Sequence, residues 1–129
     1  MIAGGTGITP FYQLIQHVFK QTPEAGEKIP ELTLIFANRT TGDILLKEEL
    51  EALANTHKGL TVLFSVDRLE EGEEWGGNVG FVDKDYLEEH VGAPEEKKLV
   101  FFCGPMPMNE FVGKALIEIG HSETNVVRY

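Results

Sequence analysis

Apolar runs of strand length alternate along this chain with segments whose apolar residues recur at helical spacing. The runs that predict strands are residues 1–3, 32–37, 60–66, 99–103 and 124–129. The patterns between them predict four helices, of which the first begins at Pro10 and the last at Pro107. Parallel neighbouring strands need right-handed crossover connections. We therefore expect an α/β fold, a doubly wound five-stranded parallel sheet with helices on both faces.

Polar residues and glycines indicate where the helices begin and end. Thr9, Asp43 and Asp83 are the expected N-caps of the first three helices, because a short polar side chain can accept a hydrogen bond from an unpaired N–H of the first turn. Gly120 is expected to end the fourth helix.

The opening of the chain joins a strand to a helix through Gly4, Gly5 and Gly7. Backbone N–H groups at a helix N-terminus, with no side chains to hold a ligand off, favour binding of a phosphate group. The alternative is a tight connection that needs glycine only for positive φ. The spacing is neither GxGxxG nor GxxxxGK[ST].

The length and charge of the chain narrow the possible classes of protein. A chain of 129 residues with 42% hydrophobic residues can form one domain with its own core. The net charge of -10 argues against nucleic acid or an anionic membrane surface as a partner of this segment. The single cysteine excludes an internal disulfide and fits a reducing, intracellular compartment.

Two further features favour ordinary structural roles over a site. The four histidines share no metal-ligand spacing, so no metal is expected. Residues 69–78 predict a long loop, in which Trp75 covers the base of the loop and the acidic run 70–74 is a solvated face.

Only three residues precede Gly4, whereas a strand usually has about five or six. We therefore expect the chain to be part of a longer protein whose missing portion lies upstream.

Ligands of such sheets bind outside the carboxyl ends of the strands. The four places to search are therefore residues 4–10, 38–40, 67–68 and 103–105.

Four motifs follow one another along the chain: GGTGITP at 4–10, DILLKEEL at 43–50, GFV at 80–82 and CGPMPM at 103–108. Together they resemble the nicotinamide-binding half of the ferredoxin-NADP reductase superfamily, in particular its cytochrome b5 reductase branch, which includes the reductase part of eukaryotic nitrate reductases. The resemblance covers essentially the whole chain. It implies that residues 1–129 are the NAD(P)-binding domain of a flavoprotein reductase, with a FAD-binding barrel domain N-terminal to it.

The resemblance also implies an activity. The intact protein would transfer a hydride from NADH to FAD and then single electrons to a haem protein, with cytochrome b5 as the expected acceptor. It would lie inside the cell, on the cytosolic face, and this domain alone would bind NADH without completing the reaction. The alternatives are the reductase portion of a nitrate reductase or flavohaemoglobin-like enzyme, or a nucleotide-binding module without redox function.

Site residues follow from the same resemblance. The turn that receives the pyrophosphate matches Gly4, Gly5, Thr6 and Gly7. Thr9 matches a hydroxyl at the junction with the flavin domain. The segment beside the nicotinamide matches Cys103, Gly104, Pro105 and Met108, although the family has proline where this chain has Met106.

Cys103 is the one expected catalytic residue, because the matching thiol helps to hold the C4 carbon of the nicotinamide over the flavin N5. The alternative is a small buried hydrophobic residue at the end of a strand. No charged neighbour would make Cys103 a thiolate, so its expected role is positioning.

The choice of NADH over NADPH rests on Asp67. Superfamily members that use NADPH generally have Ser-Arg at this point and a Lys-x-Tyr pattern downstream, where this chain has Asp67-Arg68 and Val79-Gly80-Phe81. A carboxylate accepts a hydrogen bond from the ribose 2′-hydroxyl but repels a 2′-phosphate. Arg39 and Arg68 are evidence against this choice, since either can attract a phosphate, and Phe81 keeps the aromatic face.

Overall fold

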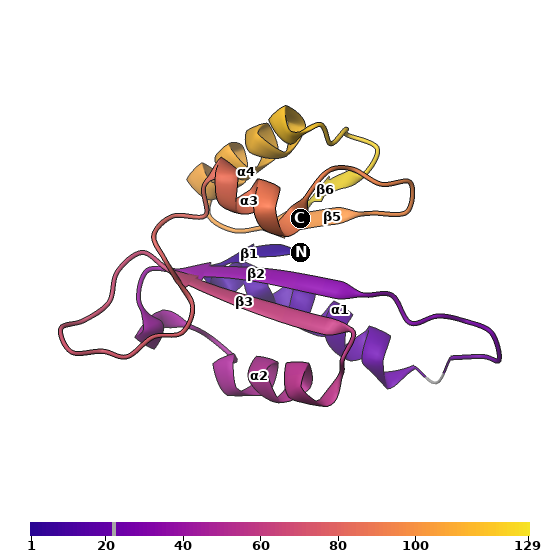
Figure 1. Cartoon of the computed structure of the whole chain (residues 1–129), viewed down its shortest axis with the longest axis horizontal. Coiled ribbons are helices and arrows are strands. Elements are labelled where there is room, and N and C mark those ends of the chain that lie inside the picture. The colour runs from indigo at the N-terminus through magenta and orange to yellow at the C-terminus, as the bar shows by residue number, and fades with distance from the viewer. Residues whose placement is uncertain (22) are drawn as a thin grey trace.

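The computed structural model describes residues 1–21 and 23–129 (Figure 1). Within them, six parallel strands form one sheet in the order β4-β3-β2-β1-β5-β6. The strands are β1 (Ile2–Gly4), β2 (Leu32–Asn38), β3 (Leu60–Val66), β4 (Asn78–Val79), β5 (Val100–Cys103) and β6 (Val126–Arg128). The predicted α/β class with a parallel sheet is therefore confirmed.

The predicted count of five strands is one too low, because β4 lies in the stretch expected to be loop. Two residues are too few for any periodicity to show in the sequence. The strand forms by pairing with Ser65 and Val66 of β3. The hydroxyl of Ser65 also donates to the carbonyl of Gly80 at 3.1 Å and accepts from the amide of Asn78 at 2.9 Å.

The helices cover both faces of the sheet, which Figure 1 shows nearly on edge. One face carries α1 (Ile8–Lys20) and α2 (Lys47–Thr56), and the other carries α3 (Lys84–Val91) and α4 (Met106–Ile119). Two short 3-10 turns, η1 (Gly5–Gly7) and η2 (Thr41–Asp43), precede α1 and α2. This arrangement confirms the doubly wound architecture.

The short β1 lies at the centre of the sheet, between β2 and β5. Ile2 and Ala3 are fully buried and point to opposite faces, as alternation along a strand requires. Ile2 joins the core under α3 and α4 with Ile35, Leu87 and Leu116. Ala3 joins the core under α1 and α2, whose members include Ile8, Phe11, Ile15, Leu34, Phe36 and Leu50.

Two of the four predicted helix boundaries are confirmed. The Asp83 carboxylate accepts the backbone N–H of Tyr86 at 2.9 Å and caps α3. Gly120 ends α4 with a φ of 114°, in the left-handed region that favours glycine.

The other two boundaries are wrong. Thr9 is not an N-cap, because η1 leads directly into α1 at Ile8, and the Thr9 hydroxyl donates to the Thr6 carbonyl at 3.1 Å. Asp43 does not cap α2 but belongs to η2, where its carboxylate accepts from the Thr40 N–H at 3.2 Å and from the Thr40 hydroxyl at 2.8 Å. In both cases a 3-10 turn, which has no hydrophobic period of its own, comes before the helix.

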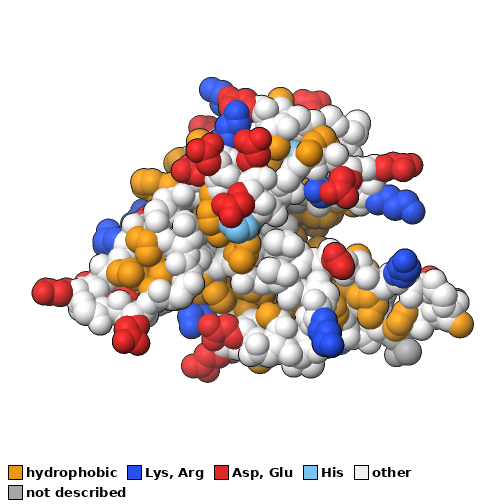
Figure 2. Space-filling model, in the orientation of Figure 1, with side chains coloured by type: hydrophobic (Ala, Val, Ile, Leu, Met, Phe, Trp, Pro, Cys, Tyr) orange, Lys and Arg blue, Asp and Glu red, His pale blue; other side chains and the backbone are white. Residues whose placement is uncertain are grey.

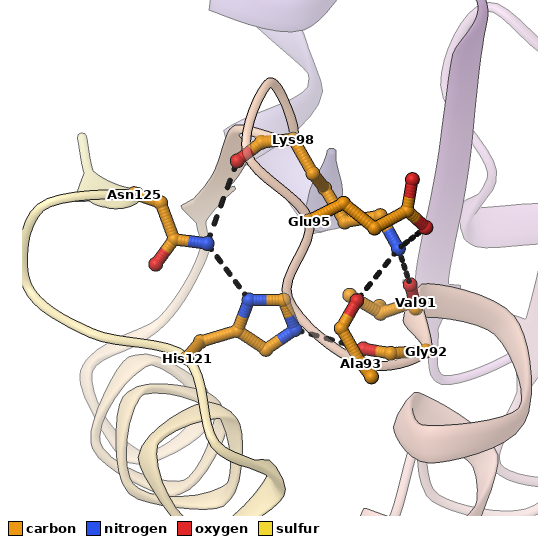
Figure 3. A network of polar contacts seen from close by, with 7 residues as sticks. All are labelled: Val91, Gly92, Ala93, Glu95, Lys98, His121 and Asn125. Atoms are coloured by element: carbon orange, nitrogen blue, oxygen red, sulfur yellow. Dashed lines mark hydrogen bonds and ion pairs between the residues drawn. The ribbon is translucent and has the colours of Figure 1, made fainter.

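A polar network joins the connections at the amino ends of β5 and β6 (Figure 3). The Lys98 ammonium donates to two backbone carbonyls at the end of α3, at 3.0 and 2.8 Å, and pairs with Glu95 at 2.9 Å. Buried His121 accepts from the Asn125 amide at 2.9 Å and donates to the Gly92 carbonyl at 2.8 Å, so its Nε2 carries the proton. The network lies at the end of the sheet opposite the carboxyl ends of the strands.

Candidate functional site

A pocket of about 1010 Å³ lies at the carboxyl ends of the strands, where the topology predicts a ligand site. Its size suits a dinucleotide, since small-molecule sites span roughly 300–1,000 Å³. Its walls come from the ends of β1, β2 and β3, from the residues after β4, and from the start of α4. The lining residues are Gly4, Gly5, Thr6, Ala37, Asn38, Arg39, Asp43, Leu45, Asp67, Arg68, Phe81, Val82, Asp83, Pro105, Pro107, Met108 and Phe111.

The glycine turn needs its glycines for two different reasons. Gly5 has a φ of 52°, the left-handed conformation, and a Cβ there would meet open space. A Cβ on Gly7 would instead press on the carbonyl of Cys103, 2.6 Å from its carbon, and one on Gly4 would strike Met108. Positive φ alone therefore explains only Gly5, and close packing on the 103–108 segment explains the other two.

The start of α1 is electrostatically open to an anion. Neither η1 nor α1 has a side-chain cap, and no acidic residue lies in either first turn. The positive end of the helix dipole is therefore not neutralised by the side chains of these turns. Gly4, Gly5 and Thr6 bring this helix start to the wall of the pocket.

Backbone pairing beyond the ends of β2 and β3 sets the charged rim of the pocket. The N–H of Asp67 donates to the carbonyls of Asn38 and Arg39, each at 3.1 Å, and the N–H of Arg68 donates to Arg39 at 3.2 Å. The side chains of Arg39, Asp67 and Arg68 are exposed. One carboxylate and two guanidinium groups therefore share one edge of the pocket.

Phe81 gives the pocket a free aromatic face. It is 80% exposed and follows Gly80, whose φ of 125° turns the chain out of β4. The N–H of Gly80 donates to the Val66 carbonyl at 2.8 Å, so the turn is fixed to β3. An exposed ring on a fixed turn is suited to stacking on a planar base.

The structure brings most of the predicted site residues to this pocket. They are Gly4, Gly5, Thr6, Arg39, Asp67, Phe81, Pro105 and Met108. Gly7, Thr9, Cys103 and Gly104 do not line it. Gly7 and Gly104 lie directly behind the lining, in contact with Cys103 and Gly4 respectively. The roles given to these residues stay predictions.

Cys103 does not line the pocket. It is half-buried and packs on the core under α1 and α2, because alternation along β5 sends Phe102 to the other face. On the same face, the ring of Tyr129 lies 5.8 Å from that of Phe11 and 6.1 Å from that of Phe101. The Cys103 thiol is therefore beside the pocket, on the α1 side of the sheet.

Several lining residues were not predicted. Phe111 of α4 is 46% exposed and lines the pocket with Leu45, which is 47% exposed. Asn38 lies in segment 38–40, one of the four expected ligand-binding segments. Its side-chain amide nitrogen is buried without a hydrogen-bond partner among the described residues. An asparagine directly after a buried strand was the signal that could have found it.

In the loop before β4, the expected position of Trp75 is confirmed, whereas Glu73 has hydrogen bonds that were not expected. Trp75 donates to the Asn78 carbonyl at 3.1 Å and packs near Phe64, as expected for a residue covering the base of the loop. Glu73 is more than a solvated charge, because it accepts from the Thr41 hydroxyl and from the Glu70 N–H. The bond from Thr41 lowers the pKa of Glu73 and fixes the loop to η2.

In residues 1–21 and 23–129 the structure has no group of three or more histidine, cysteine or acidic residues placed to hold a metal ion. Nor is any helix in this part of the chain long and apolar enough to cross a membrane.

A family model described as the oxidoreductase NAD-binding domain matches residues 1–114. The chain belongs to this family. It is 39% identical to NADH-cytochrome b5 reductase 2 of Rattus norvegicus, over 100% of the chain and 45% of that protein. It is 41% identical to NADH-cytochrome b5 reductase 1 of Aspergillus oryzae, over 98% of the chain and 43% of that protein. The NAD-binding domain thus spans less than half the length of these relatives.

Solved structures give the same result. The cytochrome b5 reductase domain of Ulva prolifera nitrate reductase superposes with a TM-score of 0.87 at 34% identity, covering 100% of this chain and 48% of that one. The CS-b5R domains of human Ncb5or, in the NAD+ form, superpose with a TM-score of 0.86 at 28% identity, covering 99% and 35%. The NAD-binding domain therefore has the ferredoxin reductase-like fold that the motifs implied.

Proposed function

We propose that this chain is the NADH-binding domain of a FAD-dependent oxidoreductase that passes electrons to a haem protein such as cytochrome b5. One observation carries the proposal. A single pocket is lined by an uncapped helix start, by a carboxylate and an exposed aromatic ring, and by Pro105, Pro107 and Met108. These are the three kinds of group that a pyrophosphate, an adenosine and a nicotinamide need.

The residues present fit the dinucleotide. Gly4 and Gly7 leave no Cβ between the phosphate turn and the 103–108 segment, so backbone N–H groups can approach an anion closely. Asp67 accepts a hydrogen bond from the ribose 2′-hydroxyl, and Phe81 stacks on adenine. Pro105 and Met108 then hold the nicotinamide end against an apolar wall.

A bound FAD would take up the hydride and release electrons singly. The chain's own contribution is to bind, orient and shield NADH. We place the FAD-binding domain upstream in the same protein, because the chain covers only 43% of a relative such as the A. oryzae reductase. The chain has a net charge of -10, and Figure 2 shows carboxylates over α3 and on the loop before β4, with Lys and Arg side chains elsewhere on the same face. This negative charge would repel an acidic acceptor, so the acceptor is proposed to dock elsewhere.

The reductase portion of a nitrate reductase is the second candidate, favoured by the match to the U. prolifera domain. It assigns the same role to this pocket and differs in the final electron acceptor. A module without redox function is less favoured, because it gives no reason for the 103–108 wall to line the same pocket as the phosphate turn.

Calorimetric titration with NADH and NADPH, for the chain and for Asp67→Ser, tests the proposal. The unaltered chain should bind NADH more tightly, by at least about fivefold, as expected for two like charges about 4 Å apart in water. Asp67→Ser should lose that preference, and Asp85→Ser, an exposed aspartate on α3, should keep it. Equal affinity of the unaltered chain for both nucleotides would refute the role of Asp67, and binding of neither would refute the pocket.

A further inference from the structure

We propose that Asn109 is a positioning residue of the nucleotide site. Its side-chain amide fixes the backbone of the Cys103–Gly104–Pro105 segment and so orients the nicotinamide end of the bound dinucleotide. The inference rests on the proposed function, because it assumes that this pocket binds NADH.

The contact is short and buried. Asn109 lies in the first turn of α4, is 6% exposed, and donates from Nδ2 to the Gly104 carbonyl at 2.7 Å. Within residues 1–21 and 23–129, no backbone N–H donates to that carbonyl. The following residue, Pro105, has no N–H to anchor the segment. Among the described residues, the Asn109 amide is therefore the donor that fixes the Gly104 carbonyl, and the backbone N–H of Asn109 donates to the next carbonyl, that of Pro105, at 3.0 Å.

The side-chain amide of Asn109 is energetically unfavourable at this buried position. Its Oδ1 is buried and has no hydrogen-bond partner among the described residues. A buried acceptor without a partner loses its hydration, and a leucine of similar volume would avoid that loss. Stability therefore does not explain the asparagine, whereas the bond from its Nδ2 to Gly104 does.

The Cys103–Gly104–Pro105 segment, which Asn109 holds, connects the phosphate turn with the wall of the pocket that begins at Pro105. A Cβ on Gly104 would come within 3.3 Å of the Gly4 nitrogen, and a Cβ on Gly7 would press on the Cys103 carbonyl. The phosphate turn and the 103–105 segment are thus in backbone contact. Pro105, which lines the pocket, follows directly. The Gly104 carbonyl bonds to Asn109 and not to the phosphate turn, so a shift of this carbonyl acts first on Pro105, the next residue of the chain.

The test compares NADH with ADP-ribose, which lacks the nicotinamide. We expect Asn109→Leu to weaken NADH binding about three- to tenfold, the loss that one hydrogen bond of about 0.7–1.4 kcal/mol represents. ADP-ribose affinity should stay unchanged, and the unfolding temperature should change little, because Asn109→Leu removes the unpaired Oδ1 together with the donor to the Gly104 carbonyl. Asn109→Asp, which puts a carboxylate oxygen against the Gly104 carbonyl, should weaken NADH at least as much.

The control is Glu110→Leu, a change at the next position of α4 on its exposed face, which should alter neither affinity. A variant that loses NADH and ADP-ribose affinity equally would show a purely structural role and overturn the inference, as would unchanged NADH affinity in both Asn109 variants. If the unaltered chain binds NADH no more tightly than ADP-ribose, the wall does not act on the nicotinamide and the inference fails. Binding of neither ligand by the unaltered chain would instead refute the proposed function itself.

Discussion

Gly7→Ala should destabilise the domain through one identifiable clash. The backbone of Gly7 has a φ of -64°, which any residue adopts, so the substitution carries no conformational strain. The new Cβ would press on the Cys103 carbonyl, 2.6 Å from its carbon and 3.0 Å from the Gly104 nitrogen. Both are backbone atoms at the carboxyl end of β5, so relief requires moving this end of β5 away from the start of α1.

Overpacking of this kind costs about 1–3 kcal/mol. In a domain of this size, each kcal/mol lowers the unfolding midpoint by about 3–5 °C. Thermal unfolding followed by circular dichroism should therefore show a midpoint lower by about 3–15 °C. NADH affinity should fall as well, because the clash separates the phosphate turn from the 103–108 wall.

The matched control is Gly42→Ala. Gly42 is exposed in η2, where a Cβ would have 3.9 Å to its nearest neighbour and the backbone is not left-handed. That variant should be neutral or slightly stabilised. An unfolding midpoint of Gly7→Ala equal to that of Gly42→Ala would refute the reasoning from close packing.

Three further predictions concern groups outside the glycine turn and the 103–108 segment. Asp83→Ala removes the N-cap of α3 and should cost about 1 kcal/mol in chemical denaturation. Lys98→Met leaves two backbone carbonyls without their donor and should cost about 1–3 kcal/mol, whereas an unchanged midpoint would mean that water replaces the ammonium. The pKa of Glu73 is lowered from 4.5 by the Thr41 hydroxyl, so the contribution of this bond is complete above that value and is lost as the pH falls through the lowered pKa. Fluorescence of Trp75, the single tryptophan, should change in this acidic range in the unaltered chain and not in Glu73→Gln.

The elements predicted best are those with the most repeats of their pattern. Residues 60–66 were expected as a strand and form β3 with the same bounds, because six of these seven residues are apolar or β-branched and leave little choice. β4 has only two residues, and its formation depends on the Ser65 hydroxyl and the Asn78 amide across the sheet edge. The left-handed Leu46, with a φ of 56°, likewise has no signal in the sequence, since leucine rarely adopts it. Contacts between distant segments, which no local pattern contains, decided the formation of β4.

The candidate site was predictable to the extent that it follows from strand ends. Parallel topology alone places residues after β1, β2, β3 and β5 at one edge, and Gly4, Arg39, Asp67 and Pro105 all reach the pocket. The direction in which Cys103 points depends on the register of β5, which the sequence does not show. The exposure of Phe111 depends on the tilt of α4 over the pocket. Neither the direction of the Cys103 side chain nor the exposure of Phe111 can be obtained from the spacing of residues within one element.

The two sides of the pocket differ in how strongly the fold constrains them. On one side, an added Cβ on Gly4 would meet the side chains of Met108 and Pro105, and one on Gly7 would meet the backbone at the end of β5, so that only the second contact requires the backbone to move. On the other side, Asp67 is held by its N–H to two carbonyls while its carboxylate is exposed. A change of that side chain leaves the backbone bonds intact. Asp67→Ser should therefore alter the preference for NADH over NADPH at unchanged thermal stability. Gly7→Ala should instead lower NADH affinity and thermal stability together. A loss of thermal stability in Asp67→Ser would show that the carboxylate also supports the fold.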